Sequence, residues 1–547
     1  MTASDDRGRL VVAGSGFAGL VAALAAHDAG LDVVVCEKGP LLGGATALSG
    51  GQVWVAGNHV AAAAGIVDDV AAGATYVRAL TADHPDLLDD AVMEEWLATA
   101  PVAASWLEEV GAVEWSLIAG FPDYHHPTHP GSTAEGRYLT PAPVDGDRLG
   151  ALRDLLPPSV HFPSGVTYAE LFDWGGQASR RHLDADVLAD RRARDVMTFG
   201  QALAATMVVA VAERGVPLLT GTAITEVQVS DGAVVGARVT RGGETWVEPG
   251  AVLLATGSYD SDGELAERFS GTPRAHAGSV APTSLTGDAV RLAESVGARV
   301  VELPAESAAR LPSLRVDPAF PGDSGDRQCH EHGLPHAIVV DAEGRRFCDD
   351  AFPNAITAAA LGARTASGRY RHLPFFMVTD DRHRQRYGLA HIPPGGTYPP
   401  DVAASADSLE ALAAAVGIDP HGLAATVARY NVHAAEGRDP DHQRGARPWS
   451  QRFKGDAHHR PHPNIGTLEV PPFHAVELRL SMTGIPAAGL GVTTGGRVVD
   501  RTGTPIPGLY GSGSAVAMTN SGAGYNSGFS LSRGMAASYL AARDWAR

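Results

Sequence analysis

The N-terminal part of the chain alternates short apolar runs with a glycine-rich turn. Residues 9–39, "RLVVAGSGFAGLVAALAAHDAGLDVVVCEKG", hold an apolar stretch, a turn with three glycines, an alanine-rich run and a second apolar stretch. Short apolar runs bounded by glycine favour buried strands, and the longer alanine-rich run favours a helix. The pattern therefore predicts strand, turn, helix and strand in that order.

Apolar patterning continues along the rest of the chain. Residues 185–250 are predicted to form one helix and then short strands separated by "SDG" and "RGGE" turns. The stretch "AVLLATGSYD" at 251–260 reads as a strand ending in a turn, and "GRVVDRTGTPIPGLYGSGSAVA" as a strand pair followed by another glycine turn. Strands and helices mixed in this way predict an α/β protein.

The first glycine turn has the spacing of a dinucleotide-binding fingerprint. Gly14, Gly16 and Gly19 follow the G-x-G-x-x-G pattern, and Glu37 ends the second predicted strand about twenty residues on. The first glycine allows the tight turn, the second lets a pyrophosphate approach the backbone, and the third lets helix and strand pack closely. A carboxylate at the position of Glu37 would accept hydrogen bonds from the hydroxyls of an adenosine ribose.

The segments downstream favour FAD over NAD. Residues 39–58, "GPLLGGATALSGGQVWVAGN", give a second glycine- and serine-rich segment where an NAD domain would continue with an ordinary helix. Such a segment is able to lie along a pyrophosphate and a flavin ring. With the Ala-Thr-Gly turn at 255–257 and the late glycine turn, it predicts bound FAD.

Composition narrows the class of protein. A chain of 547 residues with 44% hydrophobic and 19% charged residues is expected to be globular and to hold more than one domain. Its formal charge of −19 argues against binding to nucleic acid or anionic lipid. The cysteines lie far apart, no segment reads as a membrane span and the N-terminus is acidic, so a cytoplasmic protein without disulfides is expected.

Together these motifs resemble the fumarate reductase and succinate dehydrogenase flavoprotein superfamily, and within it the 3-ketosteroid dehydrogenases. The resemblance also rests on "FPDYHHPTHPGSTAEGRYLTPAPVDGDRLG", "DAEGRRFCDD", "PFFMVTDDRHRQRYGL" and "PNIGTLEVPPFHAVEL" in this order. It implies an α/β fold in which both chain ends form a Rossmann-like FAD-binding domain, residues 1–280 and 470–547. An α+β catalytic capping domain, residues 281–469, is inserted between them.

The resemblance also implies which residues hold the cofactor. Histidine is absent between positions 28 and 58, and Gly44 stands where some members attach FAD covalently, so the flavin is expected to be non-covalent. The expected cofactor-binding residues lie in the glycine turns and beside them: Gly14, Ser15, Gly16, Phe17, Ala18, Gly19, Glu37, Lys38, Gly43, Gly44, Ala45, Thr46, Ser49, Gly50, Gly51, Ala223, Ala255, Thr256, Gly257, Asp288, Gly513, Ser514, Gly524 and Asn526.

The match to the family's catalytic residues is partial. In the family a tyrosine hydroxyl and a glycine N–H hold the ketone oxygen, and a second tyrosine removes the α-proton. Here the glycine is Gly524 and the supporting tyrosine loop gives Tyr124, but the two key tyrosines fall on Asn520 and Asn354. An amide donates a hydrogen bond but takes no proton at physiological pH, so Asn520 fits the oxygen-binding role and Asn354 does not fit that of a base.

Three residues are candidates for the missing base. Tyr124 and Tyr525 are the first two, and His336, before the "DAEGRRF" turn, is the third because its pKa lies nearer working pH. Each has a structural alternative: Tyr124 packing a loop, Tyr525 facing the flavin edge, His336 as a hydrogen-bonded surface residue. The proton-donating arginine of fumarate reductase has no counterpart, since no arginine lies between Arg346 and Arg364.

The expected activity is FAD-dependent oxidoreduction at a CH–CH group beside a ketone. Desaturation of a cyclic ketone, steroidal or smaller, is the first hypothesis, with electrons passed to an unidentified acceptor other than NAD. Reduction of an enone by an unidentified donor, or flavin binding without activity, are the alternatives. Three histidine clusters lie in proline-rich loops and lack the spacing of ligands on a rigid element, so no metal site is expected, and the sequence does not set the oligomeric state.

Overall fold

A sheet that is parallel except for its edge strand, and that is built from distant parts of the chain, lies under the predicted nucleotide motif. The computed structural model describes residues 8–176 and 184–547. Its six-stranded sheet has the order β20-β21-β10-β1-β2-β6. The strands are β1 (Leu10–Ala13), β2 (Val33–Cys36), β6 (Leu218–Leu219), β10 (Ala251–Leu254), β20 (Arg497–Val499) and β21 (Pro505–Gly511).

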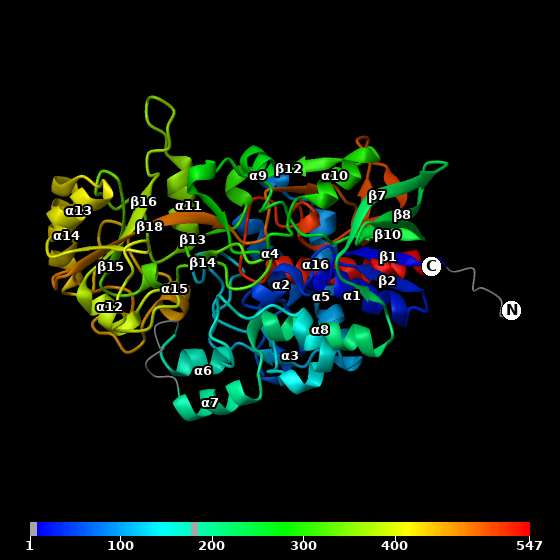
Figure 1. The fold of residues 1–547 in the computed structure, drawn as a ribbon, viewed down its shortest axis with the longest axis horizontal. Helices are drawn as coiled ribbons and strands as arrows, with labels where there is room; N and C mark the ends of the chain where they lie inside the picture. Colours follow the sequence, from blue (N-terminus) through cyan, green and yellow to red (C-terminus); the bar gives the residue numbers. More distant parts are fainter. Residues whose placement is uncertain (1–7, 177–183) are drawn as a thin grey trace.

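Both faces of this sheet are covered, which explains the unbroken apolar runs of its central strands. Along β1, Leu10 and Val12 join one hydrophobic core, and Val11 and Ala13 join another on the opposite face. The first core is formed with helices from both chain ends: α1 (Phe17–Asp28), α5 (Asp90–Glu109), α8 (Phe199–Glu213) and α16 (Phe529–Trp545). The alanines of α1 let α16 pack closely on it, so the C-terminus returns to the N-terminal strand (Figure 1).

Smaller elements complete this lobe. A three-stranded sheet, as expected from its turns, holds β7 (Thr222–Ser230), β8 (Ala233–Arg241) and β9 (Glu244–Pro249). Another consists of β3 (Val53–Trp54), β5 (Tyr138–Pro141) and β4 (Trp115–Leu117), and β12 (Val300–Glu302) pairs with β19 (Ala488–Leu490). The helices here include α2 (Gly44–Leu48), α3 (His59–Ala63), α4 (Val70–Leu80), α6 (Tyr168–Asp173), α9 (Gly263–Ser270) and α10 (Asp288–Ser295).

The single helix expected within 185–250 is two helices. Helix α7 (Ala185–Ala193) begins at the cap Asp184 and is followed by Asp195, which has a positive φ of 52°. Helix α8 then starts after Thr198. A residue in the left-handed region interrupts a helix, and here it lets Met197 pair with Val144.

The second lobe is built on a seven-stranded sheet and lies at the left of Figure 1. Its path is β14-β13-β18-β16-β15, and β11 and β17 also pair with β18. The strands are β11 (Ala277–Ser279), β13 (Arg310–Arg315), β14 (Asp326–Gln328), β15 (Ala337–Asp341), β16 (Phe375–Thr379), β17 (Ala404–Ala406) and β18 (Phe473–Met482). Helices α11 (Pro353–Gly362), α12 (Asp381–Tyr387), α13 (Leu409–Val416), α14 (Pro420–Ala434) and α15 (Pro448–Lys454) surround it.

The elements of the two lobes interleave at the domain boundaries expected from the sequence. The central strand β18 runs to Met482, past the expected end of the capping domain at residue 469. Conversely, Ala289, Leu292 and Ala293 of α10 pack in the core beneath the six-stranded sheet. The lobes exchange segments because β18 completes the second sheet immediately before the chain returns to the first.

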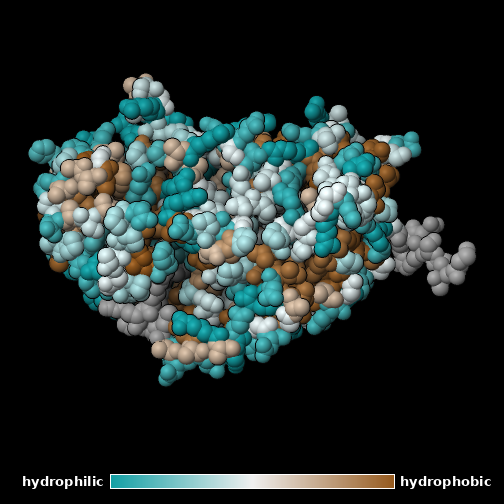
Figure 2. Space-filling model, in the orientation of Figure 1, coloured by the Kyte–Doolittle hydropathy of each residue, from teal (hydrophilic) through white to brown (hydrophobic). Residues whose placement is uncertain are grey.

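The surface of this face is mostly hydrophilic, and hydrophobic residues show mainly over the lobe that holds the six-stranded sheet (Figure 2). Among residues 8–176 and 184–547, no helix is both long enough and apolar enough to cross a bilayer. Cys36, Cys329 and Cys348 are all free thiols.

Candidate active site

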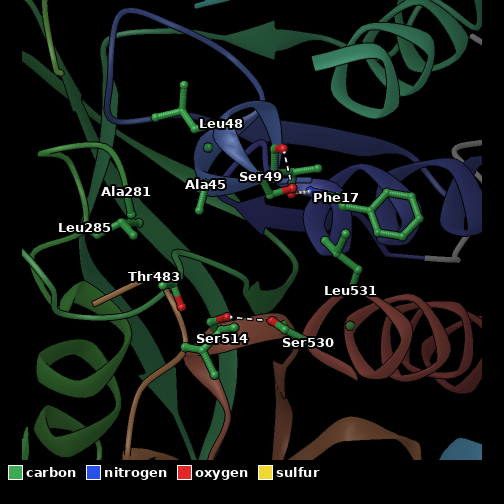
Figure 3. Close-up of a pocket in the computed structure, with 18 of the residues that line it drawn as sticks. Phe17, Ala45, Leu48, Ser49, Ala281, Leu285, Thr483, Ser514, Ser530 and Leu531 are labelled. Atoms are coloured by element: carbon green, nitrogen blue, oxygen red, sulfur yellow. Dashed lines mark hydrogen bonds between the residues drawn. The ribbon is translucent and has the colours of Figure 1, made fainter. Parts of the chain in front are cut away.

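One long cavity joins the two lobes. It starts at the glycine turn after β1 and ends among aromatic side chains of the second lobe. Figure 3 shows part of its wall: Phe17, Ala45 and Ser49 on one side, Thr483, Ser514 and Ser530 on another, and Ala281 and Leu285 between them. The wall therefore combines the N-terminal motif, the capping segment and the C-terminal turn.

The glycine turn is shaped by close backbone contacts. Gly14 has a φ of 102°, and a Cβ there would lie 2.4 Å from the carbonyl oxygen of Ala255. A Cβ on Gly19 would lie 2.0 Å from the carbonyl oxygen of Gly14. Gly16 differs, because a Cβ there would meet protein only at Thr46 Oγ1, 3.9 Å away. Gly14 and Gly19 thus serve packing, whereas Gly16 keeps the cavity open.

Glu37 lies at one end of this cavity, as the fingerprint predicts. Its Oε2 accepts hydrogen bonds from the backbone N–H of Ser15 at 3.0 Å and from Ser15 Oγ at 2.6 Å. Its Oε1 accepts from the N–H of Gly39 at 2.7 Å. These bonds fix the carboxylate beside the turn, where a ribose would lie.

The second glycine-rich segment forms the short helix α2 against the same wall. Thr46 Oγ1 accepts the N–H of Phe17 at 3.1 Å, which ties α2 to the start of α1. Ser49 Oγ donates to the carbonyl of Thr46 at 2.8 Å (Figure 3). Gln52, buried at the end of this segment, leaves its Nε2 without a hydrogen-bond partner among the described residues.

Most of the expected cofactor-binding residues line this one cavity. They are Gly14, Ser15, Gly16, Phe17, Ala18, Glu37, Lys38, Gly44, Ala45, Thr46, Ser49, Gly50, Gly51, Ala255, Thr256, Gly257, Asp288, Gly513 and Ser514. Five expected residues lie outside its lining: Gly19, Gly43, Ala223, Gly524 and Asn526. Asn526 instead accepts a hydrogen bond from the backbone N–H of Tyr124 at 2.9 Å, so it positions a neighbour of the cavity.

The far end of the cavity is aromatic. Tyr124, Trp449, Phe453 and Tyr525 line it together with Asn354, in the first turn of α11. The rings of Tyr124 and Trp449 have centroids 4.6 Å apart, and those of Tyr124 and Tyr525 are 6.3 Å apart. A flat apolar ring would therefore find large apolar surfaces here, with phenol hydroxyls as its polar partners.

Burial keeps both phenols in their protonated form. It raises the pKa of Tyr124 to about 12, although a hydrogen bond with Ser527 opposes the shift. Burial also raises the pKa of Tyr525 well above its ordinary value. Near neutral pH both side chains are suited to donate hydrogen bonds and poorly suited to remove a proton.

Asn520 and Gly524, which are expected to hold a ketone oxygen, make contacts within the protein. Asn520 lies outside the cavity lining, and its Oδ1 accepts a hydrogen bond from Arg533 Nε. The N–H of Gly524 donates to the carbonyl of Ser521 at 3.0 Å, and a Cβ at this position would lie 2.6 Å from Leu80 Cβ. Both residues thus hold the C-terminal turn against its neighbours.

His336 also lies outside the cavity lining. Its Nδ1 is 2.7 Å from the carbonyl oxygen of Thr467, and a Cβ on Gly466 would meet its ring. Burial lowers the pKa of His336. His336 is therefore a packed, hydrogen-bonded residue in the structure, away from the residues that line the cavity.

Two cationic side chains at the cavity, Arg310 and Lys454, were not predicted from the sequence. Arg310 is buried, its guanidinium donates to the carbonyls of Ala305, Ala308 and Ser270, and burial lowers its pKa to about 10. Lys454, the last residue of α15, lines the same cavity and is 1% exposed. The sequence did hold a signal for Lys454, since lysine occurs only twice in the chain.

The histidine clusters do not form a metal-binding group in the structure. Within residues 8–176 and 184–547, no three His, Cys, Asp or Glu side chains lie close enough to share an ion. His161 is the histidine of the cavity wall, and its Nε2 lies 2.9 Å from the carbonyl oxygen of Val280.

The cavity suits FAD in three respects that its residues show. The opening at Gly16 gives a pyrophosphate access to backbone at the N-terminus of α1, where the N-cap residue is a glycine and has no side chain to bond the helix. Glu37 lines the cavity, with its carboxylate where the fingerprint would place a ribose. The unpartnered Nε2 of Gln52 offers a buried donor near the joint of the lobes, where a flavin ring has acceptor atoms.

Comparisons with known proteins agree with this geometry. Residues 9–531 match the family described as FAD binding domain. The chain is 32% identical to a 4-oxocyclohexanecarboxylate 2-dehydrogenase of Sinomonas cyclohexanicum, across 98% of this chain and 92% of that protein. It is 28% identical to a 3-oxosteroid 1-dehydrogenase of Mycolicibacterium smegmatis, across 98% and 96% of the two chains.

A solved structure extends the similarity to three dimensions. The 3-ketosteroid Δ1-dehydrogenase of Sterolibacterium denitrificans, solved with 1,4-androstadiene-3,17-dione, superposes with a TM-score of 0.86 at 26% identity. The alignment covers 98% of this chain and 99% of that one. The α/β fold and the use of FAD predicted from the sequence are thereby confirmed.

Proposed function

Since the chain belongs to the FAD-binding domain family and is an FAD-dependent oxidoreductase acting on CH–CH groups, we propose that it desaturates a cyclic ketone beside its carbonyl. The observation that carries the proposal is the continuity of the cavity. It runs without a break from the nucleotide-type turn at Gly16 to the aromatic end at Tyr124 and Trp449. A ring held at that end would lie next to the part of the cavity assigned to the flavin.

The proposed roles follow from the chemistry of the wall. Gly16, Glu37 and Thr46 belong to the pyrophosphate and ribose part of the cavity, and Ser49 and Gln52 to the flavin part. FAD, when bound, supplies the acceptor for a hydride from the β-carbon. With Gly44 in the cavity wall and histidine absent between positions 28 and 58, we propose that it is held without a covalent bond.

The aromatic end would hold the ketone. Trp449 and Phe453 offer apolar surface to the ring, and Tyr124 and Tyr525 offer hydroxyl groups to its oxygen. Hydrogen-bond donors near that oxygen stabilise the negative charge that develops when the α-proton leaves. Water would be restricted here because Tyr124 is 7% exposed.

The relatives define which ketones to test. One is named for a carboxylated cyclohexanone and another for a 3-oxosteroid, so both small rings and fused rings are candidate substrates. The two positions at which the steroid enzymes are expected to carry tyrosine hold Asn354 and Asn520 here. We therefore use 4-oxocyclohexanecarboxylate as the first probe and 4-androstene-3,17-dione as the second.

Anaerobic titration followed by flavin absorbance tests the proposal. We expect 4-oxocyclohexanecarboxylate or 4-androstene-3,17-dione to bleach the oxidised holoprotein. Reoxidation of the reduced protein by 4-oxocyclohex-2-ene-1-carboxylate, without bleaching by either ketone, would assign the chain to enone reduction. No response to any of the three would leave a flavin-binding protein and overturn the proposed activity.

A further inference from the structure

The chain uses lysine in an unusual way. Of its 43 basic side chains other than histidine, 41 are arginine, and the two lysines are Lys38 and Lys454. Both lysines line the cavity that joins the lobes. Since every other basic side chain apart from histidine is an arginine, a lysine ammonium group occurs only at these two places.

Lys38 has an ordinary explanation. Its Nζ lies 2.7 Å from Asp288 Oδ2 and donates to Thr286 Oγ1, and its side chain is one-third exposed. It is placed beside Glu37, at the ribose end of the cavity. A partly exposed lysine paired with a carboxylate serves as a charged contact.

Lys454 is in a different environment. It is 1% exposed, and its Nζ lies 2.7 Å from Nδ1 of His330. Among the described residues no carboxylate lies within salt-bridge distance of it, although Glu331 is near enough to act through its charge. Cys329 and His332 also face it from the same segment, and the ring of Phe453 lies 5.5 Å from Nζ.

Such an environment favours the neutral amine. Burial lowers the pKa of Lys454 to about 8, and the nearby Cys329 and Glu331 only partly oppose it. An arginine here would stay charged at every accessible pH, whereas a lysine is able to give up and take back its proton. Retention of lysine in an arginine-rich chain is explained by a need for that exchange.

We propose that Lys454, with His330 as its hydrogen-bond partner, is the catalytic residue that removes the α-proton of the ketone. This inference rests on the proposed function. Lys454 would take the role of the base, which Asn354 does not fit because an amide takes no proton. Tyr124 and Tyr525 then remain as hydrogen-bond donors to the ketone oxygen.

The proton step balances without any further reagent. The α-C–H bond breaks, a new N–H bond forms at Nζ, and the electron pair stays on the substrate as an enolate. The neutral amine becomes an ammonium, so a positive charge appears in the cavity as the enolate oxygen becomes negative. With His330 in the tautomer that leaves Nδ1 unprotonated, Nδ1 accepts a hydrogen bond from Nζ, 2.7 Å away, and so orients the lone pair of the amine.

Exchange of α-protons with deuterium isolates this step from hydride transfer. Reduced, anaerobic holoprotein is incubated with 4-oxocyclohexanecarboxylate in D2O, and loss of the α-proton signal is followed by NMR. We expect K454M and K454R each to slow the exchange at least about 100-fold, within the range of one acid–base residue. R429M, which removes an exposed arginine of α14 paired with Asp441, is the matched control and should exchange as wild type does.

The scarcity of lysine allows a direct second measurement. In protein labelled with ¹³C at lysine Cε, only two residues give signals. We expect one signal to titrate with a midpoint near pH 8 and to be missing in K454R. This titration needs no substrate, and it holds even where K454M fails to fold.

The outcomes separate the two claims. Two lysine signals that stay protonated above pH 10, or exchange in K454R as fast as in wild type, would overturn the role of Lys454 even where ketones still bleach the flavin. Exchange that depends on Lys454 without any bleaching would uphold the proton step and overturn the desaturase activity.

Discussion

At the scale of single residues, Asn520 has a partner within the protein that the sequence did not indicate. Its amide oxygen accepts a hydrogen bond from Arg533, whose Nη2 donates to the carbonyl of Ala517 at 3.0 Å. Arg533 is buried, and burial lowers its pKa to about 10. Asn520, in the turn that precedes α16, thus provides a hydrogen-bond acceptor for the buried Arg533 of that helix.

Replacing Asn520 by alanine should therefore affect folding more than substrate binding. N520A leaves Arg533 Nε without its partner, at a cost of about 1–3 kcal/mol in the free energy of unfolding. Urea unfolding measures the loss, and KM for the ketone should stay within twofold of wild type. A KM raised tenfold with stability unchanged would instead return Asn520 to the ketone-binding role.

For single residues, the sequence predicted placements that depend on local spacing and missed those that depend on tertiary packing. Gly14, Gly16 and Glu37, which the motif predicted to lie together, all line the cavity, because their placement depends on a few neighbouring residues and a fixed spacing. The surroundings of Asn520, Gly524 and His336 were not found because their partners, Arg533, Leu80 and Thr467, are set by tertiary packing. Lys454 was not predicted as a site residue because its environment depends on burial and because the rarity of lysine belongs to no sequence motif.

At the scale of elements, the turn between β1 and α1 is the clearest link between sequence and ligand. A side chain at Gly16 would have room within the protein, since its Cβ would be 3.9 Å from the nearest protein atom, Thr46 Oγ1. The backbone there has an ordinary φ of −67°. What a Cβ would obstruct is the approach of a pyrophosphate to the start of α1.

G16A should accordingly fold normally and bind FAD at least about tenfold more weakly, an effect of about 1.4 kcal/mol. Fluorescence titration of the flavin-free protein measures the affinity, and circular dichroism checks the fold. G362A is the matched control, because a Cβ at the end of α11 meets nothing within 4 Å. Equal affinity in G16A and wild type would place the pyrophosphate elsewhere.

The second lobe has its own stabilising element at the start of α11. Asp350 accepts the N–H of Val339 in β15 at 2.7 Å and pairs with Arg346 at 3.0 Å and Arg444 at 2.6 Å. Although burial disfavours its charge, these two guanidinium groups hold the pKa of Asp350 below its usual range. The carboxylate therefore ties strand β15 to the loops that carry Arg346 and Arg444.

A depressed pKa gives stability that is complete above the unfolded-state pKa of about 3.9 and is lost as pH falls below it. D350N should lower the free energy of unfolding by about 3–5 kcal/mol at pH 7, because it leaves two buried arginines short of a charge. It should also flatten the acid limb of the stability curve. Denaturant unfolding between pH 3 and pH 7 measures both, and a mutant with the slope of wild type would contradict this role.

At the scale of the whole molecule, the cavity depends on both lobes and both chain ends. Its wall contains residues of the first turn, such as Gly16, of the second lobe, such as Trp449, and of the C-terminal turn, such as Ser514. The sequence predicted the insertion of one domain into another, but not that β18, which lies wholly beyond the expected boundary at residue 469, belongs to the sheet of the second lobe. Pairing between distant strands, as between Arg310 of β13 and Met482 of β18, is not indicated by any local pattern in the sequence.

The most direct test of the account is the pH dependence of flavin bleaching by 4-oxocyclohexanecarboxylate, measured anaerobically by stopped flow. With a neutral Lys454 as base, the rate should rise about tenfold per pH unit below pH 8 and level off above it, and K454R should show neither the rate nor the rise. A rate that is independent of pH between 6 and 9.5, or one that falls as the pH rises, would contradict removal of the α-proton by this amine.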